Sequence, residues 1–393
     1  MSRPPFPSGW SSIPLSLKNL TLANSLPVGQ SFLWHRHAIA SSTPGCPTEE
    51  FSRAVDNPPR VVCLRQSPSH LYYTGVYPNE HDALADLRRG ITKDWVNDYF
   101  QLKAHPELEK MYDDWRARDP ELFGKVEVNK RAVGVRVLRQ DPWECLIAFI
   151  TSTNNHIPRI TSLLHRFSQS FSPPLVTLHN PDNDGETTYH LFPTPTALPT
   201  KLEALLRSMG FGYRASFIES SLQTLEEEFK EEIEAGLLRW RNQDVDTVRE
   251  KLVALKGVGR KVADCVMLMC MDKPSLIPID THVAAIAARH PAFPSRLRNK
   301  PMSKQVYDET QQFLLDRWGP MGGWCQAVMF AADLPEPKPK VKVVKTKVNT
   351  SVTVKRKLEE VSPTLNLKRT RSATRLELKQ TRTIVTDEVK MEE

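Results

Sequence analysis

The chain has 393 residues, of which 40% are hydrophobic and 25% charged, so most of it is expected to fold into two or three globular domains. The longest apolar run covers residues 265–271, far short of the roughly 20 residues of a membrane span, and no leader-like segment opens the sequence, which argues against a membrane or secreted protein. The formal net charge of +7 lies entirely in residues 335–393, which hold 15 Lys+Arg and 8 Asp+Glu, so residues 1–334 carry 38 charges of each sign and their net charge predicts no binding partner.

Residues 1–135 combine Pro- and Ser-rich turns with short β-leaning runs, which predicts an N-terminal antiparallel β-sheet domain. Strands are expected at residues 30–34, 60–64 and 70–73. The six cysteines of the chain form no C-x-x-C pair and no Cys/His grouping, so we expect reduced thiols and no bound metal.

Helical periodicity dominates residues 136–334, so the predicted fold class is α+β. Helices are expected at residues 143–150, 202–209, 222–238, 247–255 and 260–271. The proline-rich stretch 173–199 is expected to be a loop within this helical part.

Residues 335–393 contain no Gly, Phe, Trp, Tyr or Cys, and a segment with so little to bury does not offset the entropy of ordering. We therefore predict a disordered basic C-terminal tail. Its Lys/Arg clusters at 355–357 and 368–371 fit nuclear import or non-specific phosphate contact, and a solvated tail without a specific role is the alternative.

Residues 247–271 have the pattern of a helix-hairpin-helix, with two predicted helices joined by the sequence LKGVG. Gly257 and Gly259 permit a positive φ or a close approach that other residues resist. Together with Val258 they would point backbone N–H groups outward, an arrangement that suits a DNA phosphate and distinguishes no base.

Lys261 lies in the first turn of the second predicted helix, with Cys265 one turn further on the same face. Asp280 precedes Thr281 as the expected N-cap of the next helix. A hairpin, a Gly/Pro-rich loop and an aspartate in this order resemble the signature of the helix-hairpin-helix DNA glycosylase superfamily, and the lysine resembles that of its bifunctional members.

This lysine and aspartate suit the chemistry of breaking an N-glycosidic bond. A carboxylate such as that of Asp280 stabilises the positive charge that develops on the deoxyribose. A neutral Lys261 amine attacks the anomeric carbon and gives a Schiff base that permits β-elimination. The helix N-terminus and burial are both expected to lower the pKa of Lys261.

Six segments in order resemble the eukaryotic 8-oxoguanine DNA glycosylase/lyase family. They are 25–34 (SLPVGQSFLW), 138–142 (LRQDP), 154–159 (NNHIPR), 210–215 (GFGYRA), 258–265 (VGRKVADC) and 323–330 (GWCQAVMF). The resemblance implies a base-excision repair enzyme that flips out and excises 8-oxoguanine opposite cytosine in double-stranded DNA and then cleaves the strand. We expect no cofactor, since water and the amine do the chemistry, and a monomer as the default for an enzyme that scans DNA. A nuclear location and downstream repair enzymes as partners are expected as well, with a mitochondrial form left open.

The resemblance also implies roles for individual residues. Lys261 and Asp280 would be catalytic. The substrate-base pocket would be formed by Gly29, Cys265, Met269, His282, Gln326, Phe330 and Asp333, with the Gly29 carbonyl accepting the N7 hydrogen that guanine lacks. Contacts with the remaining DNA would come from Asn154, Arg159, Tyr213, Arg214, Gly257, Val258 and Gly259, the first four of them around the orphaned cytosine. His156 and Pro158 depart from the family pattern beside this group.

Two other functions fit parts of the same pattern. An alkyl-purine glycosylase shares the architecture but works by water attack and typically lacks the lysine, so Lys261 argues against it. A non-catalytic helix-hairpin-helix module would bind DNA alone, and the presence of Lys261, Asp280 and a complete base pocket argues against that.

Overall fold

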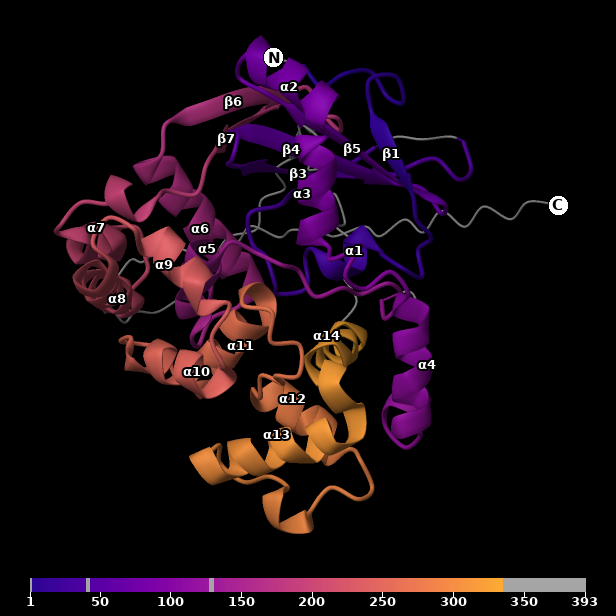
Figure 1. The fold of residues 1–393 in the computed structure, drawn as a ribbon, viewed down its shortest axis with the longest axis vertical. Coiled ribbons are helices and arrows are strands. Elements are labelled where there is room, and N and C mark those ends of the chain that lie inside the picture. The colour runs from indigo at the N-terminus through magenta and orange to yellow at the C-terminus, as the bar shows by residue number, and fades with distance from the viewer. Residues whose placement is uncertain (1, 40–42, 127–130, 335–393) are drawn as a thin grey trace, which may run out of the picture. The chain divides into compact units, whose positions relative to one another are not determined.

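A five-stranded antiparallel sheet forms the N-terminal part, as the sequence predicts (Figure 1). The computed structural model describes residues 2–39, 43–126 and 131–334, and the predicted basic tail at 335–393 lies outside the described residues. The strands run in the order β1-β5-β4-β3-β2, with β1 at Ser11–Pro14, β2 at His35–Ala38, β3 at Glu49–Val55, β4 at Arg60–Gln66 and β5 at His70–Val76. The strands predicted at 60–64 and 70–73 are confirmed.

The central strand β4 is buried on both faces. Val62 and Leu64 pack in one cluster with Val96 of α3 (Ile91–Tyr99), the helix that lies across the sheet in Figure 1. Helix α2 (Glu80–Arg89) precedes α3 in the chain. Val61 and Cys63 point to the opposite face, where a second cluster forms. Because alternate residues of a strand face opposite sides, burial of both faces accounts for the unbroken apolar run at residues 61–64.

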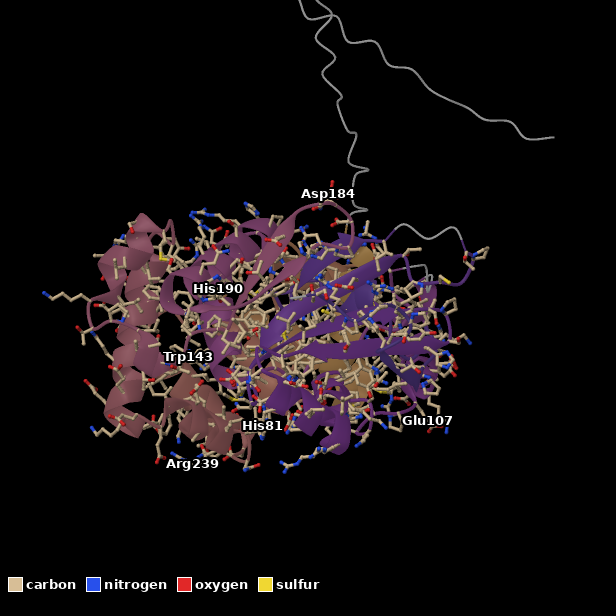
Figure 2. The ribbon with its side chains drawn as sticks, turned by 90° about the horizontal axis from the view of Figure 1, so that it is seen from above. His81, Glu107, Trp143, Asp184, His190 and Arg239 are labelled. Carbon is tan, nitrogen blue, oxygen red and sulfur yellow. The ribbon has the colours of Figure 1, made fainter. Side chains whose placement is uncertain are left out.

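The second face of the sheet is covered by a hairpin from the middle of the chain, β6 (Pro174–His179) and β7 (Glu186–His190). Figure 1 shows this hairpin beside β3 and β4, and Figure 2 shows Asp184 projecting outward from its tip. Val176, Leu178 and Tyr189 are buried against the sheet. The prediction of a loop over 173–199 is therefore wrong, because burial of these side chains stabilises two strands between the prolines.

The strand predicted at residues 30–34 is also wrong, because the neighbouring strand β2 begins only at His35. The side chain of Gln30 donates to the carbonyl oxygen of Arg136 at 2.9 Å and accepts from the N–H of Leu138 at 3.0 Å. Phe32 packs against Phe149 in the helical core. This segment is thus held by side chains and core packing.

The rest of the described chain is mainly helical. After α1 (Leu22–Ser25) and α4 (Leu108–Arg118), the helices are α5 (Pro142–Ser152), α6 (Ile157–Phe171), α7 (Leu202–Ser208), α8 (Arg214–Phe229), α9 (Ile233–Trp240), α10 (Val245–Ala254), α11 (Arg260–Cys270), α12 (Thr281–Ala288), α13 (Lys304–Trp318) and α14 (Gly322–Asp333). Short 3-10 turns lie at Phe123–Lys125, Pro195–Ala197, Ser295–Leu297 and Gly319–Met321. The single helix expected at 222–238 is two helices, since Lys230 leaves the helical region with a φ of +56°.

Buried arginines join segments that are far apart in the sequence. Arg53 of β3 and Glu144 of α5 form an ion pair of 2.5 Å, and both side chains are buried. The Arg136 guanidinium donates to the carbonyl oxygens of Asn19, Phe100 and His105.

The domain boundary predicted between residues 135 and 136 stays a prediction. Within the described ranges, no helix combines the length and the apolar character that a bilayer crossing needs.

Candidate active site

A cavity opens between α11, α14 and the loop that precedes β2, with about 450 Å³ of empty space including its mouth. Twelve residues line it: Val28, Gly29, Gln30, Phe149, Lys261, Cys265, Met269, Pro278, Asp280, Gln326, Ala327 and Phe330. Seven of them belong to the predicted site, including both predicted catalytic residues. Segments far apart in the sequence therefore meet around one cavity, as a substrate pocket requires.

Helix α11 supplies one wall as a stripe of side chains. Lys261, Cys265 and Met269 follow one another at intervals of four residues, about one helical turn, so they lie on one face. The ammonium nitrogen of Lys261 lies 5.6 Å from the centre of the Phe149 ring, which comes from α5. The amine is thus held between an aromatic wall and the open cavity.

Asp280 is fixed in the pocket by its capping role. Its Oδ1 accepts a hydrogen bond of 2.8 Å from the N–H of Val283, which confirms the predicted N-cap of α12. Pro278 also lines the cavity, so the chain just before α12 forms the wall that carries the carboxylate.

The pKa of Lys261 is raised, contrary to the expectation from the sequence. Burial lowers the pKa of Lys261, but the interaction with Cys265 and the negative charge of Asp280 raise it by more, so its pKa lies above the ordinary value. Burial raises the pKa of the Cys265 thiol to about 11, against the opposing effect of Lys261. The predicted lowering of the Lys261 pKa is therefore wrong for the resting protein, in which the amine is an ammonium ion.

Gly29 lies close to Phe330 in the lining of the cavity. Its φ of +85° is in the left-handed region that favours glycine, and a Cβ there would lie 3.4 Å from Ile157 Cδ1 and 3.9 Å from Phe330 Cε1. Because Gly29 has no side chain, its backbone atoms themselves line the pocket. Cys265 faces the same space from α11, so the two residues predicted to sandwich a base both line it.

Gln326 lies one helical turn before Phe330 on α14 and is 7% exposed, so its amide group is available only to a group inside the cavity. Sequence analysis missed Val28, Gln30, Phe149, Pro278 and Ala327. Phe149 belongs to an apolar helical pattern that gives no sign of a pocket, whereas Val28 and Gln30 flank the predicted Gly29.

Two predicted pocket residues, His282 and Asp333, lie behind Phe330 and do not line the cavity. The His282 ring is edge-on to the Phe330 ring at 5.0 Å between centres. His282 Nε2 lies 3.0 Å from Asp333 Oδ2, and the other oxygen of Asp333 lies 2.7 Å from Arg289. His282, held next to Asp333, is therefore placed to support the Phe330 ring.

The residues predicted to surround an orphaned cytosine come together at the turn before α6 and the start of α8. Asn154 has a φ of +46°, and Arg214 donates to the carbonyl oxygens of Thr153 and Asn154 from a position that is 3% exposed. Arg159 donates to the Gly210 carbonyl at 3.1 Å. Tyr213 is 43% exposed beside them, with the Arg214 guanidinium 4.6 Å from its ring centre.

The departure from the family pattern at His156 has a local structural role. Its side chain accepts a hydrogen bond of 3.4 Å from the N–H of Arg159 and so caps α6, whose first turn contains Pro158. The His156 side chain and Pro158 thus stabilise the start of α6 next to Asn154.

The predicted hairpin joins α10 to α11. Gly257 has a φ of +84°, and a Cβ there would overlap the Phe217 ring at 2.3 Å, so glycine is required. Val258 is buried, while Gly259 is exposed and caps α11 without a side-chain hydrogen bond. The backbone at the start of α11 is therefore accessible at Gly259, as contact with a phosphate requires. No cluster of His, Cys, Asp and Glu suited to a metal ion occurs among residues 2–39, 43–126 and 131–334.

The chain is similar to known proteins over most of its length. A family model described as the N-terminal domain of 8-oxoguanine DNA glycosylase matches residues 12–146. The N-glycosylase/DNA lyase OGG1 of Arabidopsis thaliana is 32% identical over 84% of this chain and 81% of its own length. The N-glycosylase/DNA lyase of Saccharomyces cerevisiae is 30% identical over 81% of this chain and 85% of its own.

The fold is similar to that of solved structures. The 8-oxoguanine glycosylase/lyase of Clostridium acetobutylicum, in complex with double-stranded DNA containing cytosine opposite 8-oxoguanine, superposes with a TM-score of 0.60. The two chains are 24% identical, and the match covers 80% of this chain and 91% of the other. At this identity the superposition shows the architecture alone.

Proposed function

The chain belongs to the 8-oxoguanine DNA glycosylase family, and from this membership we propose that it excises 8-oxoguanine opposite cytosine with Lys261 as the nucleophile. It is a bifunctional enzyme, a DNA N-glycosylase with DNA lyase activity, like its plant and yeast relatives. The base opposite the lesion and the Schiff base on Lys261 are the parts that we propose. The cytosine in the complex of the Clostridium enzyme supports the first of them.

The proposal rests on the meeting of an amine and a carboxylate with the predicted base-contacting residues around one cavity. Lys261 and Asp280 line the same cavity as Gly29, Gln326 and Phe330. An N-glycosylase must hold a flipped base, stabilise a cationic sugar and, as a lyase, supply an amine. These residues supply all three requirements within one cavity.

The reaction proceeds from the fraction of Lys261 that has released its proton to water and is a neutral amine. Lys261 attacks C1′ of the deoxyribose as the bond from C1′ to the base breaks, and the base leaves with the bonding electrons and takes up a proton. Asp280 stabilises the positive charge that develops on the sugar. The sugar ring opens to give a Schiff base, a proton leaves C2′, and the 3′ phosphate departs in β-elimination.

Discrimination against guanine rests on the backbone of Gly29. The N7 of 8-oxoguanine carries a hydrogen and donates, whereas the N7 of guanine is an acceptor that a carbonyl oxygen repels. Gln326 reads the Watson–Crick edge, and Cys265 and Phe330 enclose the base from two sides. Gly29, Cys265, Gln326 and Phe330 all line one cavity, which supports this arrangement.

Recognition of the orphaned cytosine belongs to the turn before α6 and the start of α8. Asn154, Arg159 and Arg214 read its acceptor edge, and Tyr213 occupies the vacated stack. The donors of Arg214 are engaged with Thr153 and Asn154, so it also holds the turn that presents Asn154. The N–H groups around Gly259 bind the phosphate backbone. We expect a nuclear monomer that needs no cofactor and passes its product to other repair enzymes.

Single-turnover excision would test the proposed substrate. We expect the protein to release 8-oxoguanine fastest opposite cytosine and to leave guanine in the same sequence uncut, because only the lesion donates to Gly29. The measurement uses duplexes with either purine opposite each of the four bases. Equal rates opposite all four bases would contradict the proposed cytosine recognition, and release of guanine would contradict the proposed role of Gly29.

The raised pKa of Lys261 predicts a pH dependence for the lyase step. Because only the neutral amine attacks, and its pKa lies above the ordinary value, the neutral fraction should rise by up to about tenfold per pH unit between pH 6 and 9. Borohydride trapping on DNA with a preformed abasic site, under single-turnover conditions, would measure this. A rate independent of pH, with DNA binding constant across the range, would contradict it.

A further inference from the structure

A buried carboxylate on α11 organises the wall of the pocket from behind. Asp264 lies three residues after Lys261 and is fully buried, with an exposed fraction of 0%. Its Oδ2 accepts hydrogen bonds from Tyr307 Oη at 2.8 Å and from Gln311 Nε2 at 2.7 Å, both from α13. Its Oδ1 lies 3.2 Å from Arg249 Nε of α10. Multiple charge-assisted bonds hold a buried carboxylate in one position.

The two α13 side chains continue from Asp264 to the segment that carries Asp280. Tyr307 Oη accepts a hydrogen bond of 3.1 Å from the N–H of Ile279, the residue just before Asp280. Gln311 Nε2 donates to the Ile277 carbonyl oxygen at 2.9 Å. The segment between these bonds contains Pro278, which lines the cavity. Both sides of this segment are therefore tied to the helix that carries the nucleophile.

The hydroxyl of Tyr307 has two roles that no other group of this network combines. It donates to a carboxylate and accepts from a backbone N–H, while its ring is 4% exposed. Burial and the charge of Asp264 raise the pKa of Tyr307, so the hydroxyl keeps its proton and the chain of hydrogen bonds stays intact. One link thus runs from α11 through Asp264 and Tyr307 to the backbone beside Asp280.

We propose that Tyr307, together with Asp264 and Gln311, is a positioning residue that sets the distance of the Asp280 carboxylate from the reacting sugar and from Lys261. This inference rests on the proposed function, because it assigns Asp280 the role of stabilising the cationic sugar. A carboxylate stabilises a developing charge only when it is preorganised, so a small displacement slows the chemical step and leaves DNA binding intact.

The substitution Tyr307→Phe tests this with the least disturbance, since it removes one hydroxyl and keeps the ring. We expect the single-turnover rate of 8-oxoguanine release to fall about tenfold, with unchanged affinity for DNA. The matched control is Tyr112→Phe. Tyr112 is 5% exposed, and its hydroxyl likewise donates to a carbonyl oxygen, that of Ala132, and accepts from an N–H, that of Val135, outside the cavity lining. The control should lower the rate less than about twofold.

A double-mutant cycle separates positioning from general loss of structure. If Tyr307 acts through Asp280, then Tyr307→Phe should have little effect in the Asp280→Asn background, because the charge that it positions is gone. The same tenfold loss in both backgrounds, or equal losses in Tyr307→Phe and Tyr112→Phe, would overturn the inference. An active wild-type protein whose rate Tyr307→Phe leaves unchanged would overturn it as well. A wild-type protein that releases no 8-oxoguanine would instead overturn the proposed function, and the inference with it.

Discussion

Replacing Lys261 by glutamine should abolish the covalent adduct that borohydride traps between the wild-type protein and DNA containing 8-oxoguanine opposite cytosine. Glutamine has a similar length but no nucleophilic amine, so neither the Schiff base nor β-elimination is available. We expect the rate of strand cleavage to fall by at least about 10⁴-fold, as loss of a nucleophile does in comparable active sites. The measurement is gel separation of trapped and free DNA after single-turnover incubation.

A suitable control for this experiment is Lys304→Gln. Lys304 is an exposed lysine and, like Lys261, lies in the first turn of a helix, but it comes from α13 and is outside the cavity lining. This variant should trap DNA like the wild type. An adduct that persists in Lys261→Gln would show that another amine is the nucleophile.

Replacing Asp280 by asparagine should slow base release by on the order of 10²–10³-fold, because the carboxylate charge that stabilises the cationic sugar is lost. Asparagine still accepts the hydrogen bond from Val283, so α12 should keep its cap and the protein its affinity for DNA. The measurement is single-turnover release of 8-oxoguanine under saturating protein, together with binding to the same duplex.

The substitution Asp280→Asn should also shift the pH dependence of the lyase step toward lower pH. The charge of Asp280 contributes to raising the pKa of Lys261, so its removal should lower that pKa and shift trapping on preformed abasic sites toward lower pH. Asp244→Asn is the matched control, because Asp244 also caps a helix, α10, and lies outside the cavity. Unchanged base release in Asp280→Asn would contradict its assigned role.

The sequence predicted those parts of the fold in which local pattern and tertiary packing agree. The strands at 60–64 and 70–73 and the helices around the hairpin carry their own signals of β-propensity, periodicity and caps. The hairpin β6–β7 was missed because prolines and turn residues surround it. Its alternation of Val176 and Leu178 with Thr177 and His179 was a usable signal, but the sheet face that stabilises these strands comes from residues 54–76. No local pattern shows such a partner.

The candidate site was predictable where short motifs carry chemistry. Lys261 and Asp280 were identified from the helix-hairpin-helix pattern and Gly29 from the family resemblance, and the structure brings all three to one cavity. The network behind them was not predictable, because Asp264 meets Tyr307 and Gln311 across 43 and 47 residues. The pKa of Lys261 was predicted in the wrong direction, since only the helix position and burial were considered, whereas the interactions with Cys265 and with Asp280 raise it.

Between encounters with DNA, the ammonium form of Lys261 also protects the enzyme from its own reactivity. Sugars and small aldehydes condense with neutral amines and not with ammonium ions. A permanently neutral lysine in a cavity open to solvent would be consumed by such metabolites. A pKa above the ordinary value keeps the Lys261 amine mostly protonated at neutral pH and therefore lowers its reactivity toward such aldehydes.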